Sequence, residues 1–188
     1  MFRRFSYFIL QIFGWRVVGD VPPEAQRCVL VFAPHTSAWD FIVGKMALYY
    51  MRVPVKFMIK KEAFWFPLGL ILKAMGAIPV NRQQSMRLPV YAAELFEKNE
   101  KLALMIAPEG TRKNTENWKR GFHYIAQKAN VPMAIGFMDW KTKTGGIITI
   151  KEPSNDYEKD LEEIQKHYYG MQGKYKGQFN LENRTKDE

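Results

Sequence analysis

The chain has 188 residues, of which 47% are hydrophobic and 14% aromatic, a composition that suits one globular domain and excludes a disordered protein. Its net charge of +9 is unevenly spread, because residues 151–188 hold 7 of the 28 basic and 9 of the 19 acidic side chains. Residues 1–150 therefore hold 21 basic against 10 acidic residues. Such a basic region suits a nucleic acid, an anionic membrane or a phosphorylated substrate, and a merely solvated basic surface is the alternative.

The single cysteine, Cys28, excludes an internal disulfide framework and any metal cluster built on cysteines. It lies within the apolar run 28–33, where we expect it to be a small core residue. This cysteine content favours a reducing, cytoplasmic compartment.

Residues 1–15 predict an amphipathic helix. Its apolar face would carry Phe2, Phe5, Phe8, Ile9, Ile12, Phe13 and Trp15, with Arg3, Arg4, Gln11 and Gly14 opposite. The stretch is shorter than the roughly 20 apolar residues of a membrane span and has no signal-peptidase-like site, so we expect it to lie in a membrane interface. A first helix docked on the core is the alternative.

A second apolar segment covers residues 63–80 and is interrupted by Pro67, Gly69, Lys73, Gly76 and Pro79. Because of these interruptions we do not expect it to cross a bilayer. Its Trp, Phe and Lys residues suit a position against lipid headgroups or in the wall of an acyl-chain cavity.

The alternation of apolar runs and helical patterns predicts an α/β fold, a single-domain sandwich with a mixed, largely parallel sheet flanked by helices. Strands are expected at 28–33, 54–59, 77–81, 102–107, 131–138 and 146–151, and helices near 38–51, 62–75, 84–99, 118–129 and 156–169. Gly145 and Gly146 predict a hairpin turn. The expected organisation is a helix over 1–19, a domain over 20–170 and a polar tail over 171–188 that frays.

The first chemically informative motif is His35 followed by Asp40, directly after an apolar strand. A carboxylate near an imidazole fixes its tautomer and favours its protonated form, so the pair predicts an acid/base dyad in which His35 accepts a proton from a hydroxyl. The alternative makes Asp40 a helix-capping or surface residue and His35 an ordinary loop residue.

The second motif is the run Glu109-Gly110-Thr111-Arg112, which also follows an apolar strand. Open α/β sheets bind ligands beyond the carboxyl ends of their strands, so both motifs are expected at one mouth. Guanidinium groups bind phosphate bidentately and a Gly-Thr turn exposes N–H groups, which favours an anion site. The candidate anion ligands are Arg82, Arg112, Lys113, Lys119 and Arg120, with Arg82 and Arg112 preferred.

Several other chemistries are not expected. The chain has no Gly-x-Ser-x-Gly nucleophile elbow and no phosphate-binding or dinucleotide glycine motif. Direct attack by a bound hydroxyl is therefore simpler than a covalent acyl-enzyme. His123 and His167 lack metal-ligand spacing with His35, so no metal is expected. Residues 119–124 match an RNA-recognition strand poorly, so no nucleic-acid partner is expected.

The order and spacing of these motifs resemble the glycerolipid acyltransferase family, of the 1-acylglycerol-3-phosphate acyltransferase type. Residues 34–40 correspond to the family's Asn-His-x-Ser-x-x-Asp block, and residues 76–82 to Gly-x-Ile-x-x-x-Arg. Residues 107–112 correspond to Phe-Pro-Glu-Gly-Thr-Arg, residues 119–121 to a basic-basic-Gly run, and residues 131–135 partly to Val-Pro-x-x-Pro.

The resemblance implies that His35 deprotonates an acceptor hydroxyl and that Asp40 orients it. It implies that Arg82 and Arg112 hold the acceptor's phosphate and that Glu109 helps to arrange the acceptor. The acyl donor would be a thioester, carried by acyl-carrier protein or coenzyme A, and no further cofactor is implied. Family members work at the cytoplasmic face of a membrane, which implies membrane lipids as partners and a peripheral location in phospholipid synthesis.

The chain departs from the family pattern at Pro34, Asn81, Ala107 and Ile135, where the family has Asn, Asp, Phe and Pro. The dyad is intact, but these changes leave the acceptor open between lysophosphatidic acid, another lysophospholipid and a lyso amino-acid lipid. Two other classes remain as alternatives: a non-catalytic lipid-binding protein that kept the fold, and a nucleic-acid-binding module.

Overall fold

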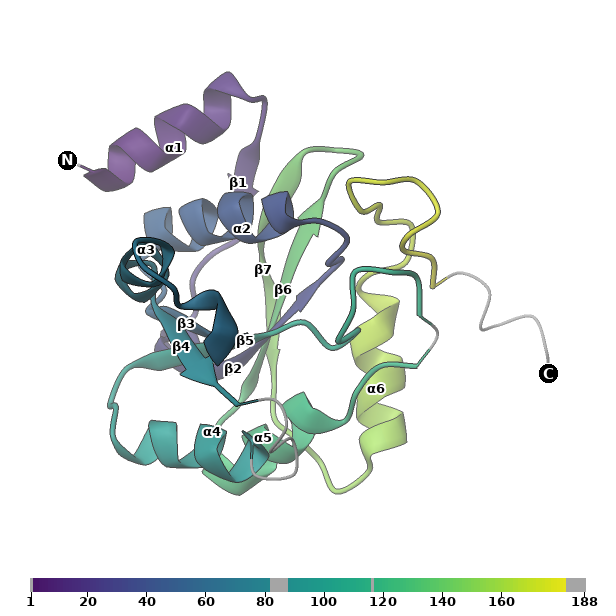
Figure 1. The fold of residues 1–188 in the computed structure, drawn as a ribbon. Helices are drawn as coiled ribbons and strands as arrows, with labels where there is room; N and C mark the ends of the chain where they lie inside the picture. Colours follow the sequence, from purple (N-terminus) through teal and green to yellow (C-terminus); the bar gives the residue numbers. More distant parts are fainter. Residues whose placement is uncertain (1, 82–87, 116, 182–188) are drawn as a thin grey trace.

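The computed structural model describes residues 2–81, 88–115 and 117–181 (Figure 1). The helices are α1 (Phe2–Ile12), α2 (Ala38–Tyr50), α3 (Leu68–Ala74), α4 (Leu88–Glu97), α5 (Gly121–Ala129) and α6 (Tyr157–Lys166), with 3₁₀ turns η1 (Pro23–Gln26) and η2 (Lys61–Ala63). The strands are β1 (Arg16–Val18), β2 (Arg27–Ala33), β3 (Val55–Lys60), β4 (Ala77–Val80), β5 (Leu102–Ile106), β6 (Met133–Asp139) and β7 (Thr144–Lys151).

The strands form one seven-stranded sheet in the order β1-β7-β6-β2-β5-β3-β4. All neighbouring pairs are parallel except β6 and β7, which form an antiparallel hairpin. The predicted α/β fold with a mixed, largely parallel sheet is confirmed. From β2 the chain proceeds through β3 to β4 and then returns to β5 and β6, so right-handed crossovers place α2 and α3 on one face and α4 and α5 on the other.

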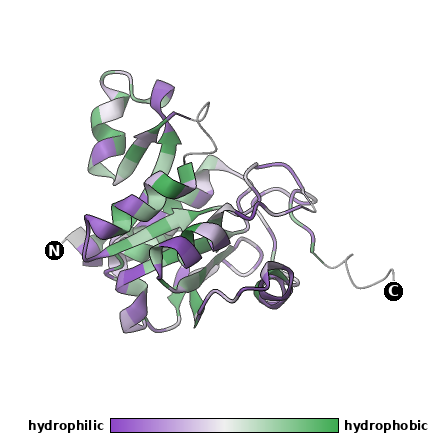
Figure 2. Ribbon diagram, turned by 90° about the horizontal axis from the view of Figure 1, so that it is seen from below, coloured by the Kyte–Doolittle hydropathy of each residue, from purple (hydrophilic) through white to green (hydrophobic). Residues whose placement is uncertain are grey.

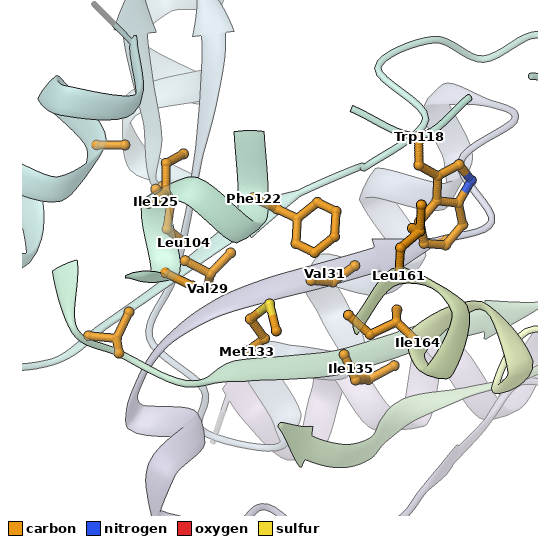
Figure 3. Packing of buried hydrophobic residues seen from close by; sticks show 14 of the residues in the cluster. Val29, Val31, Leu104, Trp118, Phe122, Ile125, Met133, Ile135, Leu161 and Ile164 are labelled. Atoms are coloured by element: carbon orange, nitrogen blue, oxygen red, sulfur yellow. The ribbon is translucent and has the colours of Figure 1, made fainter. Parts of the chain in front are cut away.

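The two faces have separate cores. On the α4–α5–α6 face, side chains of the central strands pack against those helices; Figure 3 labels Val29, Val31, Leu104, Trp118, Phe122, Ile125, Met133, Ile135, Leu161 and Ile164. On the other face, Leu30 and Leu48 belong to one cluster and Leu10 and Phe32 to another. Figure 2 shows hydrophobic strands enclosed by helices that carry both polar and apolar residues, as expected for a sheet buried on both faces.

The sequence analysis missed one strand and misplaced one turn. Gly145 and Gly146 lie inside β7, and the hairpin turn precedes them. The cause is a close approach: a Cβ atom on Gly146 would lie 1.9 Å from the carbonyl oxygen of Val18. Gly146 is thus glycine so that β1 can pair with β7, which makes it a strand residue rather than a turn residue.

Helix α1 combines both interpretations of the N-terminus. Leu10 and the following Trp15 are buried, the ring of Tyr7 stacks on Tyr50, and Arg3 donates to the carbonyl oxygen of Tyr50 at 3.0 Å. The helix is therefore docked on α2, and Trp15 does not belong to its exposed face. Four other apolar side chains point into solvent: Phe5, Phe8, Ile12 and the adjacent Phe13 are all more than half exposed.

A second group of exposed apolar residues lies around α3, on the same face of the sheet. The predicted helix over 62–75 is divided into η2 and α3, with Pro67 at the junction, where its missing N–H and fixed φ favour a break. The exposed side chains are Trp65, Phe66, Leu70 and Ile71. Within the described residues, none of the helices is both long enough and apolar enough to span a bilayer.

The segment 171–181 does not fray as predicted. Phe179 and Leu181 are buried in the core of the α4–α5–α6 face, and Gln172 accepts a hydrogen bond from the backbone N–H of Trp140 at 2.9 Å. Two apolar side chains within a polar sequence are enough to dock it. We refer to residues 171–181 as the C-terminal segment. Residues 182–188 of the predicted tail lie outside the described residues.

Candidate active site

Both sequence motifs lie at the carboxyl ends of the neighbouring parallel strands β2 and β5. The chain leaves β2 toward α2 on one face of the sheet and leaves β5 toward α5 on the other. Adjacent strands whose connections diverge in this way form the crevice in which open α/β sheets bind ligands. The backbone N–H of His35 donates to Oε1 of Glu109 at 2.9 Å, across 74 residues of sequence, so the predicted common mouth is confirmed.

Asp40 is fully buried and holds the loop that carries His35. Its Oδ2 accepts from the backbone N–H groups of Thr36 and Ser37, and its Oδ1 accepts from the Ser37 hydroxyl at 2.8 Å. The backbone N–H of Asp40 in turn donates to Ser37 Oγ, which completes a capping box at the start of α2. Asp40 is thus both a helix-capping residue and a dyad residue, although the sequence analysis treated these two roles as alternatives.

His35 directs Nδ1 toward Asp40, with 3.7 Å between Nδ1 and Oδ2. This separation exceeds hydrogen-bond length, and catalytic contacts of this kind often tighten when a substrate binds. Because Nδ1 faces the carboxylate, Nε2 is the ring nitrogen that remains for a ligand. His35 is 23% exposed, whereas Asp40 is closed off from solvent.

The electrostatic balance keeps His35 neutral. Burial lowers the pKa of His35, Asp40 acts to raise it, and the positive charge of Arg112 lowers it further. The net shift is downward, because loss of solvation outweighs attraction to the carboxylate. Asp40 therefore favours the protonated imidazole as expected, but burial outweighs this effect, and near neutral pH His35 is in the unprotonated form that can accept a proton.

Glu109 is a buried carboxylic acid, 4% exposed. Burial raises the pKa of Glu109 to about 8, although hydrogen bonds from backbone N–H groups, including that of His35, act to lower it. Its second oxygen, Oε2, has no hydrogen-bond partner among the described residues. Near neutral pH the group is therefore mostly protonated, and it carries a buried oxygen without a hydrogen-bond partner among the described residues.

This protonation predicts a pH-dependent stability. The folded pKa lies above the unfolded one, so the stabilising contribution of Glu109 is full below about pH 4.5 and is lost as pH rises to about 8. Glu109→Gln, which cannot ionise and keeps an acceptor for His35, should be increasingly stable relative to wild type across this range. Urea titrations between pH 5 and 8 check this. Glu97→Gln on an exposed position of α4 is the control, and parallel pH profiles for wild type and Glu109→Gln would contradict it.

The loop after Glu109 carries exposed cations. Gly110 has φ +65°, where glycine is favoured, and its N–H is used by the carbonyl oxygen of Ala107 rather than exposed to a ligand. Arg112 and Lys119 are exposed, and neither has an ion-pair partner among the described residues. Thr111 is exposed, and its hydroxyl accepts from Lys113 N–H at 3.2 Å. The backbone N–H of Lys119 donates to the carbonyl oxygen of Pro108 at 2.7 Å, and this hydrogen bond closes the loop.

The other sequence candidates lie elsewhere. Arg82 falls outside the described residues, so its assigned role stays a prediction. Arg120 pairs with the exposed Glu158 and lies over the ring of Tyr157. Cys28 is a core residue as predicted, and burial raises the pKa of its thiol to about 12, which excludes it as a nucleophile near neutral pH.

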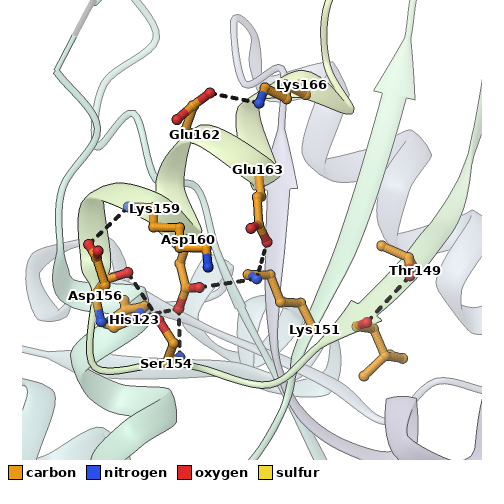
Figure 4. Close-up of polar contacts among 11 residues, drawn as sticks. His123, Thr149, Lys151, Ser154, Asp156, Lys159, Asp160, Glu162, Glu163 and Lys166 are labelled. Atoms are coloured by element: carbon orange, nitrogen blue, oxygen red, sulfur yellow. Dashed lines mark hydrogen bonds and ion pairs between the residues drawn. The ribbon is translucent and has the colours of Figure 1, made fainter.

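The structure holds a second His–Asp pair on the α5–α6 side, between His123 and Asp160 (Figure 4). Nε2 of His123 lies 2.8 Å from Oδ2 of Asp160, and Lys151 lies 3.1 Å from the other carboxylate oxygen. The backbone N–H of Ser154 donates to the same carboxylate at 2.7 Å. The pair is buried and its carboxylate is satisfied by protein donors, so we assign it to stability rather than to chemistry.

Some residues around the dyad were missed by sequence reasoning. Ser37 could have been found, since Ser followed by an acidic residue three positions later is a helix-start signal. Trp140 donates from Nε1 to Asp40 at 2.7 Å, and the amide of Gln178 faces the carbonyl oxygens of Thr36 and Arg112, to which its nitrogen would donate once the amide is turned over. These contacts come from positions far along the chain, where the sequence gives no local signal.

Comparison with known proteins agrees with this geometry. A family model described as Acyltransferase matches residues 15–163. The human protein 1-acyl-sn-glycerol-3-phosphate acyltransferase beta is 32% identical over 166 residues, which covers 79% of this chain and 57% of the relative. The chain thus spans little more than half the length of that relative.

A solved structure shows the same fold. It is the crystal structure of the 1-acyl-sn-glycerophosphate (LPA) acyltransferase PlsC from Thermotoga maritima, with a TM-score of 0.63 and 17% sequence identity. The match covers 88% of this chain and 74% of that chain. The family match includes the dyad and the Glu109–Arg112 loop, whereas the C-terminal segment lies beyond it. By that match and the arrangement of these residues, the chain belongs to the acyltransferase family.

Proposed function

We propose that the protein is a peripheral membrane O-acyltransferase that moves a fatty acyl group from a thioester to the hydroxyl of a lyso-glycerolipid, most simply 1-acylglycerol 3-phosphate. The observation that carries the proposal is the neutral His35, backed by Asp40 and tied to Glu109 at the mouth between β2 and β5. Acyl-carrier protein or coenzyme A would carry the acyl group. The names of the similar proteins support the acceptor class.

The site supports direct transfer without a covalent enzyme intermediate. Nε2 of His35 takes the proton of the acceptor hydroxyl while that oxygen attacks the thioester carbonyl. The tetrahedral intermediate then breaks its carbon–sulfur bond, and the imidazolium returns its proton to the leaving thiolate. Between these steps the Asp40 carboxylate stabilises the imidazolium. It can do so because Nδ1 of His35 already faces Oδ2 of Asp40 in the resting site.

The Glu109–Arg112 loop supports an anionic acceptor. Arg112 offers a planar fork of donors that fits a phosphate bidentately, and Lys119 adds a second unpaired positive charge. The protonated Glu109 supports this loop, because its Oε1 accepts from the backbone N–H of His35 and joins the two loops. Arg82 belongs to the same proposal by resemblance.

The test is a product analysis. The purified protein is incubated with an acyl thioester and separately with lysophosphatidic acid, other lysophospholipids, a lyso amino-acid lipid and monoacylglycerol, and products are identified by mass spectrometry. We expect the fastest acylation of lysophosphatidic acid. Arg112→Lys should lower kcat/KM for this acceptor much more than for monoacylglycerol, because an ammonium cannot reproduce the bidentate fork.

Arg52→Lys, the same change at an exposed position after α2, is the matched control and should behave like wild type. Equal loss with both acceptors would contradict the phosphate assignment. If the wild type prefers the amino-acid lipid, that lipid replaces lysophosphatidic acid as the proposed acceptor. If no acceptor is acylated, the enzymatic proposal is overturned in favour of a lipid-binding protein.

The membrane part of the proposal rests on exposed apolar side chains. Phe5, Phe8, Ile12 and Phe13 project from α1 while Leu10 docks it, so the helix presents an apolar face without losing its attachment. The exposed Arg4 and Arg16 suit anionic headgroups, whereas Arg3 is engaged with carbonyl oxygens of α2. We place this face against the cytoplasmic surface of a membrane.

Replacing Phe5, Phe8 and Ile12 together with glutamine should release the protein from anionic liposomes in flotation assays. Each side chain is expected to contribute roughly 1 kcal/mol or more at an interface, so binding should fall by roughly 100-fold or more. Activity on detergent-dispersed substrate should persist, because Leu10 and Trp15 still dock the helix. Tyr124→Gln on exposed α5 is the control. If the triple variant still floats with the liposomes, the membrane-binding surface is instead the group Trp65, Phe66, Leu70 and Ile71.

A further inference from the structure

Asp40 receives one of its hydrogen bonds from a distant part of the chain. The donors from Thr36 and Ser37 belong to the same short loop, so they shape the loop without fixing it to the rest of the molecule. Trp140, 100 residues away in sequence, follows the end of β6 and donates from Nε1 to Oδ1 at 2.7 Å. Among the described residues, it supplies the donor to Asp40 that comes from outside the loop.

The indole of Trp140 is itself held from three sides. Its ring meets that of Trp15 edge to face with centroids 5.0 Å apart, and the ammonium of Lys174 lies 5.2 Å from its centroid. Its backbone N–H donates to the carbonyl oxygen of Gln172, while the N–H of Gln172 donates to the buried carboxylate of Asp139 at 2.9 Å. The indole is therefore fixed by the core and by the C-terminal segment.

The C-terminal segment also contacts the dyad loop directly. Lys174 N–H donates to Thr36 Oγ1 at 2.9 Å, and a Cβ atom built on Gly173 would lie 2.3 Å from Cγ2 of Thr36. Glycine at this position permits an approach that a larger residue would prevent. Trp140 and the C-terminal segment thus both contact the loop that carries His35, Trp140 through Asp40 and the segment through Thr36.

We propose that Trp140 is a positioning residue of the acyltransferase site, which holds Oδ1 of Asp40 so that Oδ2 faces His35. The inference rests on the proposed function for its kinetic consequences, but its geometric content concerns only the dyad. With Oδ1 occupied by the indole and the Ser37 hydroxyl, the carboxylate cannot rotate away from Nδ1.

The test compares Trp140→Phe with Trp15→Phe. Both changes remove an indole from the same aromatic cluster, but only position 140 donates to Asp40. Trp140→Phe should lower kcat by about 10- to 100-fold with little change in acceptor KM, the range expected for one hydrogen bond to a charged group. Trp15→Phe should remain close to wild type. Loss of the donor lets the Asp40 carboxylate turn away from Nδ1, which weakens the attraction that raises the pKa of His35, so the acid limb of the pH–rate profile should move to lower pH.

A measurement that needs no turnover separates this inference from the proposed function. The pKa of His35 is followed by NMR titration of its ring signals, assigned with His35→Ala, in wild type and both variants. The pKa should fall in Trp140→Phe, because the attraction of Asp40 acts to raise it and would be weakened, and it should stay unchanged in Trp15→Phe, even if no acceptor proves active. The titratable and charged groups around the dyad are Asp40, Glu109, Arg112 and Lys174, and neither substitution replaces any of them.

An unchanged His35 pKa together with an unchanged kcat in Trp140→Phe would overturn the inference, as would identical shifts in both variants. Should Trp140→Phe fail to fold, the benzothienyl analogue of tryptophan at position 140 replaces the N–H by sulfur and keeps the ring volume. It is expected to give the same kinetic and titration result, and a wild-type result with this analogue would equally reject the assignment.

Discussion

His35→Ala is expected to lower turnover by roughly 10²- to 10⁴-fold, the usual contribution of a general base. The structure makes this residue the neutral imidazole at the mouth, with Nδ1 toward a buried carboxylate and Nε2 left for the acceptor. Acceptor KM should change less, because the cations assigned to the phosphate lie on the other loop. Initial rates with acyl thioester and lysophosphatidic acid measure the effect, and His167→Ala at the exposed end of α6 is the control.

Asp40→Asn should also reduce turnover, since an amide cannot stabilise the imidazolium and cannot accept all the donors that surround this side chain. Combined with His35→Ala it should cost less than the product of the single effects, as residues that act as a unit are not additive. Independent, multiplicative losses would separate Asp40 from the chemistry and leave it only as a helix cap.

Asp160→Ala should reduce the free energy of unfolding by about 3–5 kcal/mol, the range for removing one partner of a buried ionic group. It would leave His123 buried without its carboxylate and would remove the buried partner of Lys151. Burial acts to raise the pKa of Asp160, but hydrogen bonds from Ser154, His123 and Lys151 bring it below its usual range. This contribution is therefore present above about pH 4 and is lost as pH falls below that.

Urea denaturation at neutral pH gives the magnitude, and repetition in acid should show a smaller difference from wild type. Glu163→Ala is the matched control, because Glu163 pairs with the same Lys151 from a half-exposed position, where water screens the pair and its loss should matter little. Losses of similar size in the two variants would show that burial of Asp160 carries no special weight.

The sequence predicted the fold and the meeting of the two motifs for a physical reason. Apolar runs such as 28–33 and 102–107 can only be buried strands, and the carboxyl ends of neighbouring parallel strands bring the residues that follow them together. His35 and Glu109 could therefore be placed at one mouth from local patterns alone. Glu109 was correctly assigned to the mouth, but its protonation depends on burial, which no local pattern reports.

The parts that were missed depend on contacts between distant positions. Strand β1 is three residues long, and it pairs with β7 because Gly146 leaves room for Val18. The sequence alone suggests that two consecutive glycines form a turn, so this pairing could not be predicted from it. Trp140 looks like a core aromatic until its distance from Asp40 is known. The C-terminal segment is polar by composition and yet contributes Phe179 to the core.

The hydrogen bond between the C-terminal segment and Thr36 affects the order in which the protein folds. Their contact joins positions 138 residues apart, among the largest separations of any hydrogen bond around the dyad, and contacts of high separation require costly loop closure. We expect the sheet to assemble first and the His35 loop to remain loosely ordered until residues 171–181 have been synthesised and docked. A nascent chain would then expose its apolar helices before it has a competent site, so membrane contact would precede the first acyl transfer.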